Sequence, residues 1–188
     1  MRALPYIAMP LVVALAFAAM SCGRDSGRTA TPLRYAYPRV AVYDSIYSPA
    51  DVGPVTVDVN AAAEPTSPRP GWLDISYRRY GTTLYLSAIH TDDPASSVAN
   101  RRERIALNLG GAKATTHTFT AGSYECVVVE SADAATTPVQ LLAVSPCGIV
   151  VSGTAVLSSP SASADSIRPV VATLTRDAIH LLMSLDKN

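Results

Sequence analysis

The sequence predicts an α+β fold, in which an antiparallel sheet is packed by helices, and three observations support this. Short apolar stretches separated by turn residues recur between residues 55 and 157, as in successive β-strands. One helical pattern interrupts them at residues 94–109, and a longer amphipathic one closes the chain at residues 167–185. Because most strands follow one another directly, we expect antiparallel pairing, with the helices covering the sheet.

The first expected strand covers residues 55–59, where valine alternates strictly with threonine and aspartate. The three prolines of residues 61–71 predict a loop. Residues 72–89 have the pattern of a hairpin, because apolar side chains alternate on both sides of a turn at Arg78–Gly81.

The central helix has recognisable ends. Asp93 supplies an acceptor at the N-cap position, and Pro94 suits the first helical position. Gly110 and Gly111 are expected to end the helix. The strands expected after it are Thr115–Phe119, Tyr124–Glu130, Val139–Val144 and Ile149–Leu157, with a turn at Ser145–Gly148 between the last two.

The C-terminal segment has the clearest helical periodicity, with apolar residues at steps of three and four. Asp165 or Ser166 is expected to cap this helix, which places Pro169 in the first turn, where proline is tolerated. The apolar positions are Ile167, Val170, Val171, Leu174, Ala178, Leu181, Leu182 and Leu185.

Charge and composition limit the class of protein. The 188 residues have a formal net charge of zero, so the chain lacks the basic surface expected of a nucleic-acid-binding protein. Apolar residues make up 48% of the chain, which is enough for a globular core. We expect a signal peptide at residues 1–21, a flexible tether at 22–34 and a single α+β domain at 35–188.

The N-terminus has the layout of a secretory signal, because Arg2 precedes an uncharged apolar run at residues 3–20. The sequence Ala-Met-Ser-Cys at residues 19–22 resembles the lipobox of bacterial lipoproteins, whose cysteine receives lipid and becomes the new N-terminus. This resemblance implies that Cys22 carries acyl chains such as palmitate, which hold the protein on a membrane. Ordinary signal cleavage nearby and an uncleaved anchor are the alternatives.

The residue after the cysteine bears on localisation. Gly23 stands there, and no aspartate follows Cys22 to indicate inner-membrane retention. We therefore expect the protein in the outer membrane, facing the periplasm.

Two further cysteines, Cys126 and Cys147, would lie in an oxidising envelope compartment, where they could form a disulfide. Two separate thiols, one on a strand and one in a turn, are the alternative. The cysteines and histidines show no metal-ligand spacing, so we expect neither a metal nor a cofactor.

The sequence gives little support for catalysis, because no nucleophile accompanies a base and an orienting group. His90 next to Asp92 and Asp93 is a candidate acid–base or metal cluster, although helix capping explains Asp93 better. We expect His180 to be a packing or surface residue. The charged run at residues 101–104 is expected to be a solvated helix face, with docking of an acidic partner or headgroup as the alternative.

Several stretches, in order, resemble the gliding motility lipoprotein GldD family, and together they span nearly the whole chain after the signal. They are Tyr35–Val40, the tryptophan-led hairpin Trp72–Ser87, the strand Thr137–Leu142 and the closing helix around Asp165–Val170 and Asp177–Leu181.

The resemblance implies a non-enzymatic cell-envelope lipoprotein for gliding motility and type IX protein secretion, in contact with other envelope proteins of that machinery. The secretion role could persist in a bacterium that does not glide. We expect partner contacts at Tyr35, Tyr37, Pro38 and Arg39, since tyrosine and arginine are favoured at interfaces. The alternative for the tyrosines is that they cover the sheet. The alternative function is a periplasmic lipoprotein that binds a lipid or glycan in an apolar pocket.

Overall fold

The computed structural model describes residues 46–134, 136–158 and 164–187, which all belong to one structural unit, Tyr37–Asn188. The elements in chain order are β1 (Tyr47–Val52), β2 (Val55–Asn60), β3 (Glu64–Thr66), β4 (Trp72–Tyr77), the 3-10 turn η1 (Arg78–Tyr80), β5 (Thr82–His90), α2 (Pro94–Leu109), β6 (Thr115–Ala121), β7 (Tyr124–Glu130), β8 (Val139–Val144), β9 (Ile149–Leu157), α3 (Ala164–Met183) and the 3-10 turn η2 (Ser184–Lys187).

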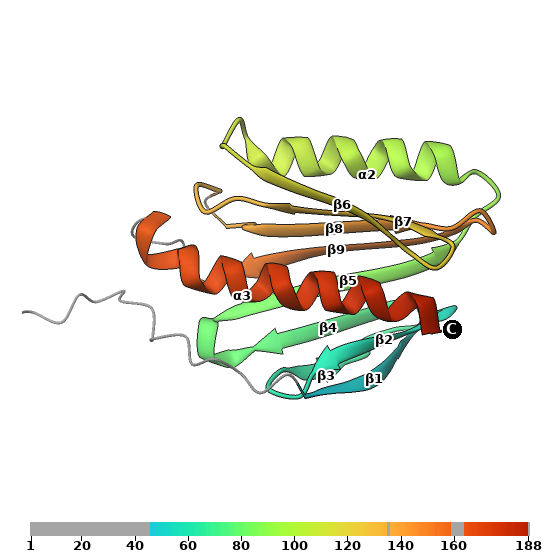
Figure 1. Cartoon of the computed structure of the whole chain (residues 1–188), viewed down its shortest axis with the longest axis horizontal. Helices are drawn as coiled ribbons and strands as arrows, with labels where there is room; N and C mark the ends of the chain where they lie inside the picture. Colours follow the sequence, from blue (N-terminus) through green and yellow to red (C-terminus); the bar gives the residue numbers. More distant parts are fainter. Residues whose placement is uncertain (1–45, 135, 159–163, 188) are drawn as a thin grey trace, which may run out of the picture. The chain divides into compact units, whose positions relative to one another are not determined.

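Seven strands form one sheet in the order β3-β4-β5-β9-β8-β7-β6 (Figure 1). Every neighbouring pair in it is antiparallel. Helix α2 carries the chain from the inner strand β5 to the edge strand β6, and a meander then returns it to β9 beside β5. Strands β1 and β2 pair separately as a two-stranded antiparallel ribbon. The predicted α+β class and antiparallel pairing are confirmed.

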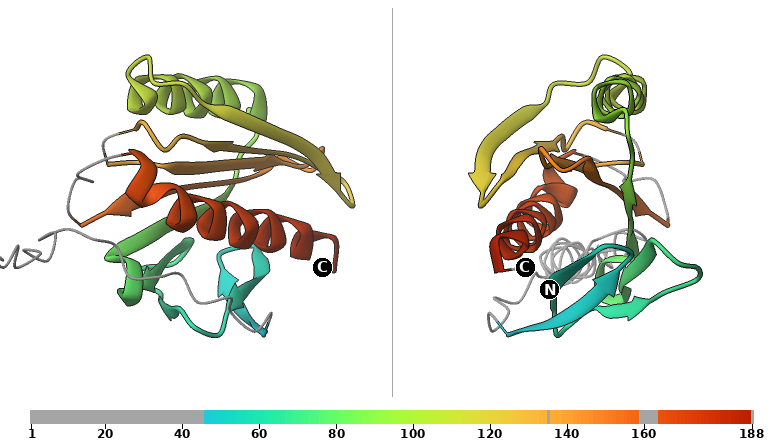
Figure 2. Two further views of the ribbon diagram at one scale, coloured as in Figure 1. Left: turned by 60° about the vertical axis from the view of Figure 1, so that its left-hand side comes forward. Right: turned by 90° about the vertical axis from the view of Figure 1, so that its right-hand side faces the viewer.

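The two helices lie on opposite faces of the seven-stranded sheet, as the views in Figure 2 show. Helix α3 contacts β6, β7 and β8 on one face, and it also contacts strand β2 of the ribbon. Helix α2 contacts β8 and β9 on the other face. The ribbon and α3 therefore belong to one side of the molecule, and α2 belongs to the other.

The hydrophobic core lies between α3 and the sheet. Alternate residues of the inner strands are fully buried there, among them Leu86 on β5, Leu141 on β8 and Val128 on β7. All eight apolar positions expected in the C-terminal segment are buried against this layer. Burying an aliphatic side chain of this size contributes roughly 1.5–3 kcal/mol, so α3 is a major source of stability.

Helix α2 is attached much more loosely, because none of its residues is buried. Val98, Ile105 and Leu109 are half-buried against the sheet, whereas Leu107 is 71% exposed.

The two ends of α2 match the expectation from the sequence. The Ser96 amide donates a hydrogen bond of 3.0 Å to the Asp93 carboxylate at the N-cap, and the helix ends at a glycine in the left-handed region.

Two local expectations were wrong, and strand β1 lies where none was made. Strand β3 lies within the expected loop at residues 61–71. Pro65 fits β3 because this strand is at the sheet edge, where no ladder donor is needed on the open side. Helix α3 begins at Ala164, earlier than expected, so Asp165 and Ser166 are helical residues and Pro169 lies inside the helix.

The turn between β8 and β9 generates a prediction about stability. Gly148 has φ +81°, and a Cβ there would clash with the backbone carbonyl oxygen of Thr91. Gly111 has a similar φ of +85°, but a Cβ there would meet no atom within 4 Å. We expect Gly148→Ala to lower the unfolding free energy by about 2–4 kcal/mol, since backbone strain and overpacking add. Gly111→Ala should cost only about 1–2 kcal/mol from strain.

Urea unfolding of the two variants beside the parent measures the difference. Equal losses at the two glycines would show that the close approach to Thr91 does not constrain this turn.

Candidate functional site

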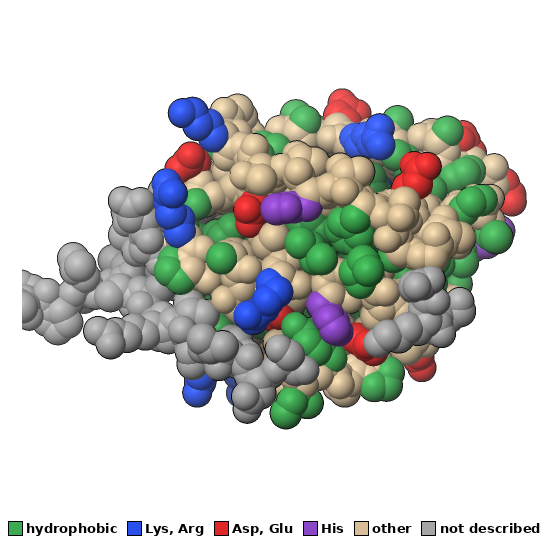
Figure 3. All heavy atoms as spheres, in the orientation of Figure 1, with side chains coloured by type: hydrophobic (Ala, Val, Ile, Leu, Met, Phe, Trp, Pro, Cys, Tyr) green, Lys and Arg blue, Asp and Glu red, His purple; other side chains and the backbone are tan. Residues whose placement is uncertain are grey.

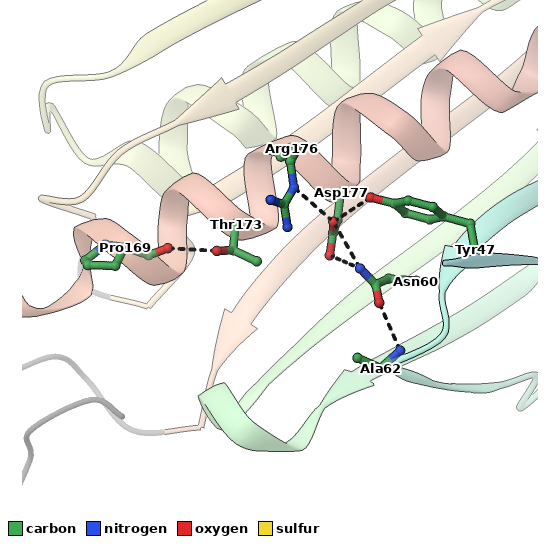
Figure 4. A network of polar contacts seen from close by, with 7 residues as sticks. All are labelled: Tyr47, Asn60, Ala62, Pro169, Thr173, Arg176 and Asp177. Carbon is green, nitrogen blue, oxygen red and sulfur yellow. Dashed lines mark hydrogen bonds and ion pairs between the residues drawn. The ribbon is translucent and has the colours of Figure 1, made fainter. Parts of the chain in front are cut away.

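A buried polar cluster joins the β1–β2 ribbon to α3 (Figure 4). The side chain of Asp177 on α3 is only 3% exposed. Its carboxylate accepts a hydrogen bond of 3.0 Å from the Tyr47 hydroxyl on β1. It also accepts from the Asn60 amide on β2, at 3.2 and 3.4 Å to its two oxygens. We call Tyr47, Asn60 and Asp177 the ribbon clamp.

The ribbon register brings the two donors of the clamp together. Tyr47 opens β1 and pairs directly with Asn60, the last residue of β2, so their side chains lie on the same face. The Asn60 side-chain oxygen accepts a hydrogen bond of 2.9 Å from the Ala62 amide, which leaves its NH2 group directed at Asp177. A buried carboxylate is tolerated only where such donors replace water.

The electrostatics of the clamp follow from burial. Burial raises the pKa of the Asp177 carboxyl above its ordinary value, and the hydrogen bonds from Tyr47 and Asn60 offset this only in part. Arg176 also offsets it, with its Nε 3.7 Å from the carboxylate. Burial likewise raises the pKa of Tyr77 on β4, and the Asp177 charge adds to that rise. The phenol therefore stays protonated beside the carboxylate.

A second set of contacts surrounds the clamp. The His180 ring stacks on Tyr47, with ring centroids 3.6 Å apart, and its Nε2 lies 3.8 Å from the Asp58 carboxylate. The Asp58 backbone amide donates to the Ser184 hydroxyl at 2.8 Å. His180 therefore packs at the surface of this contact, as expected from the sequence. On the face in Figure 3, cationic and anionic side chains are interspersed, with no large area of one sign.

The clamp was not predicted from the sequence, although one signal for it exists. Asp177 follows Leu174 by three positions and precedes Leu181 by four, which places an acid within the buried apolar stripe. A charged residue at such a position predicts a buried hydrogen-bonded group. Its partners are 130 and 117 positions away in the chain, so local patterns could not name them.

The other two histidines, His90 and His117, lie outside the ribbon clamp. His90 and Asp92 are exposed, while Asp93 caps α2, so these three residues form no cluster. No group of three or more metal-binding side chains occurs among the described residues. On β6, the Nε2 atom of His117 lies 3.4 Å from one carboxylate oxygen of Glu130, whose other oxygen accepts a hydrogen bond of 2.6 Å from the Thr175 hydroxyl.

The two cysteines are free thiols in the structure, so the disulfide considered from the sequence is not formed there. Cys126 is buried on β7, and burial raises the pKa of its thiol to about 11. Cys147 is exposed in the turn after β8. The alternative of two separate thiols, one on a strand and one in a turn, describes this arrangement.

The predicted N-terminal features lie outside the described residues. These are the signal peptide at 1–21, the tether at 22–34, the lipid-bearing Cys22 and the contact residues Tyr35, Tyr37, Pro38 and Arg39. In the part of the chain that the structure describes, no helix has the length and apolar character needed to cross a bilayer.

Grooves occur on both sides of α2. One of about 440 Å³ lies between α2 and strands β6–β8, and Val98, Phe119 and Leu142 contribute to its lining. Another of about 280 Å³ lies toward β8 and β9 and is lined by Arg101, Arg104 and Gln140. Pockets for small molecules usually measure about 300–1,000 Å³, so the first groove lies in the lower part of that range and the second falls just below it.

Comparison with known proteins adds no assignment. No family model matches the chain, and no curated protein matches it.

The clamp generates a prediction about stability and pH. Asp177→Ala removes the acceptor of both Tyr47 and Asn60, so we expect it to lower the unfolding free energy by about 2–4 kcal/mol. Asp177→Asn keeps an acceptor without the buried charge, and we expect it to cost less than about 1 kcal/mol near neutral pH.

The stability of the parent and the stability of Asp177→Asn should also depend differently on pH. Because folding raises the pKa of Asp177, the folded parent binds this proton more tightly than the unfolded chain does. The stability from this group is therefore full below the unfolded-state pKa and is lost as pH rises through the folded-state value. Urea unfolding of the parent and of Asp177→Asn across that pH range measures both unfolding free energies. The difference between them, parent minus variant, should decrease as pH rises. A constant difference would contradict the raised pKa.

Proposed function

We propose that this chain is a non-enzymatic cell-envelope lipoprotein that serves as an accessory or scaffold component for gliding motility and type IX protein secretion. The secretion role could persist where gliding does not. The proposal is supported by the secretory layout that ends at Cys22 and by the ordered resemblance to the GldD family from Tyr35 to Leu181.

The ribbon clamp is the structural observation that carries the scaffold role. β1, the first described strand after the predicted tether, is bound to the C-terminal helix through Tyr47 and Asp177. A tethered scaffold must keep a fixed surface while it is held from one end, and the clamp ties the tether-proximal strand to the core. Lipid at Cys22 would hold this domain at the outer membrane, facing the periplasm.

The proposal includes two finer features. Helix α3 is amphipathic, with its buried apolar positions against the sheet and charged residues such as Arg168 and Arg176 exposed on the outer face. Tyr35, Tyr37, Pro38 and Arg39, which precede the ribbon in the chain, contact other envelope proteins of the motility and secretion machinery.

A second candidate is a periplasmic lipoprotein that binds a lipid or glycan. Buried apolar side chains fill the layer under α3, so the site we assign to this candidate is the groove of about 440 Å³ beside α2, which is lined in part by apolar side chains. Native mass spectrometry of the protein purified from its own membrane distinguishes the two roles. A co-purifying lipid or glycan would favour the second candidate, and its absence would favour the scaffold.

The scaffold role predicts a phenotype in the native bacterium. We expect deletion of the gene to abolish release of type IX cargo, and Cys22→Ala to have the same effect, because the domain would no longer be held at the membrane. Cys147→Ala is the matched control, since this cysteine is exposed and unbonded, and we expect it to secrete normally. Mass spectrometry of culture supernatants measures the cargo, and unchanged secretion in the deletion strain would refute the proposal.

A further inference from the structure

The groove on the β8–β9 side of α2 carries two cations, and neither has a counter-ion among the residues that the structure describes. Arg101 and Arg104 line it, together with Asn108, Gln140 and Thr154. Neither arginine side chain forms an ion pair or a hydrogen bond with any residue in the described part of the chain. They are neighbours on the helix surface at i and i+3.

Arg101 is in an unfavourable position as long as no anion is present. It is half-buried between α2 and the sheet, and burial lowers the pKa of its guanidinium, with a further contribution from the Arg104 charge. Two like charges this close weaken each other's solvation and repel. An anion in the groove would relieve both effects, so the site gains more from anion binding than two exposed arginines would.

The floor of the groove is polar and held in place. Gln140 on β8 is only 1% exposed, and its side-chain oxygen accepts a hydrogen bond of 2.8 Å from the Asn108 side chain. The Gln140 NH2 group donates to the backbone carbonyl of Ile105 at 3.4 Å. These bonds fix the arginine-bearing turns of α2 relative to β8, so a ligand would find the groove already formed.

Apolar side chains lie exposed around the same groove. Leu107 on α2, which also lines it, is 71% exposed. Tyr85 on β5 is 43% exposed and pairs directly with the groove residue Thr154, so both are on the same sheet face. Tyrosine and arginine are enriched at protein interfaces, and the exposed leucine beside them adds apolar surface that a partner could bury.

We propose that this groove docks an extended acidic segment of a partner protein, with carboxylates on Arg101 and Arg104 and neighbouring apolar groups against Tyr85 and Leu107. Alternate side chains of an extended peptide lie about 7 Å apart on one face, close to the spacing of the two arginines. The inference rests on the proposed scaffold function, for which it names the docking surface and the chemistry of the partner.

A protein segment fits this groove better than a membrane surface does. Arg101 is recessed between α2 and the sheet, where a side chain can enter but a flat layer of headgroups cannot approach closely. Cations that bind membranes usually lie on an open basic face, whereas this chain has no net charge.

The test uses the full-length lipoprotein purified in detergent and a fluorescent synthetic peptide, Glu-Val-Glu-Val-Glu, with Gln-Val-Gln-Val-Gln as its neutral counterpart. We expect fluorescence anisotropy to show binding of the acidic peptide alone. The double variant Arg101→Ala/Arg104→Ala should weaken binding by at least about tenfold. Arg79→Ala/Arg102→Ala removes the same charge from two exposed positions that do not line this groove, and it should bind as the parent does.

Three results would overturn the proposal. They are failure of the parent to bind the acidic peptide, equal weakening by the two double variants, and binding of short-chain phosphatidylglycerol, but not the peptide, through Arg101 and Arg104. Urea unfolding of each variant shows whether the fold is intact. We expect it to be, since Arg101 is only half-buried and Arg104 is exposed. The titration is independent of secretion, so its failure is distinguishable from failure of the scaffold function.

Discussion

Asp177 carries a carboxylate into the space between α3 and the β1–β2 ribbon, where the side chains of Tyr47 and Asn60 take the place of water. Burying this charge is costly unless both donors reach it. A ribbon shifted by one residue would direct both donors away from the carboxylate, so the register of the ribbon is constrained. The ribbon is a separate two-stranded sheet, and such hairpins are only marginally stable alone. Its position therefore depends on α3, through the clamp and the valines buried beneath it.

The two faces of the seven-stranded sheet differ in how the helix on each face is packed. On the α3 side, buried apolar side chains and the ribbon clamp fill the layer between the helix and the sheet. On the α2 side, a helix without a buried residue rests on polar and half-buried contacts, and its arginines lack a partner among the described residues.

The parts of the fold that could be predicted were those with a local pattern. The Asp93 cap, the Ser145–Gly148 turn and the eight apolar positions of the C-terminal segment depend on neighbours a few residues apart. β1 escaped prediction because Tyr47–Val52 has no alternating apolar pattern, and it is a strand only because β2 pairs with it. The clamp and the arginine groove join residues from distant elements, so the sequence indicated single members, such as the charged run at 101–104, without their surroundings.

Amide hydrogen exchange measures whether Asp177 holds the ribbon in place. We expect Asp177→Ala to lower the protection of amides in β2 by about tenfold or more, because the ribbon then opens without global unfolding. The amides of β8 lie in the middle of the seven-stranded sheet. Their protection should fall only by the amount that the loss of global stability accounts for. If the two strands lose protection equally, or β2 loses none, the ribbon is held by something other than this carboxylate.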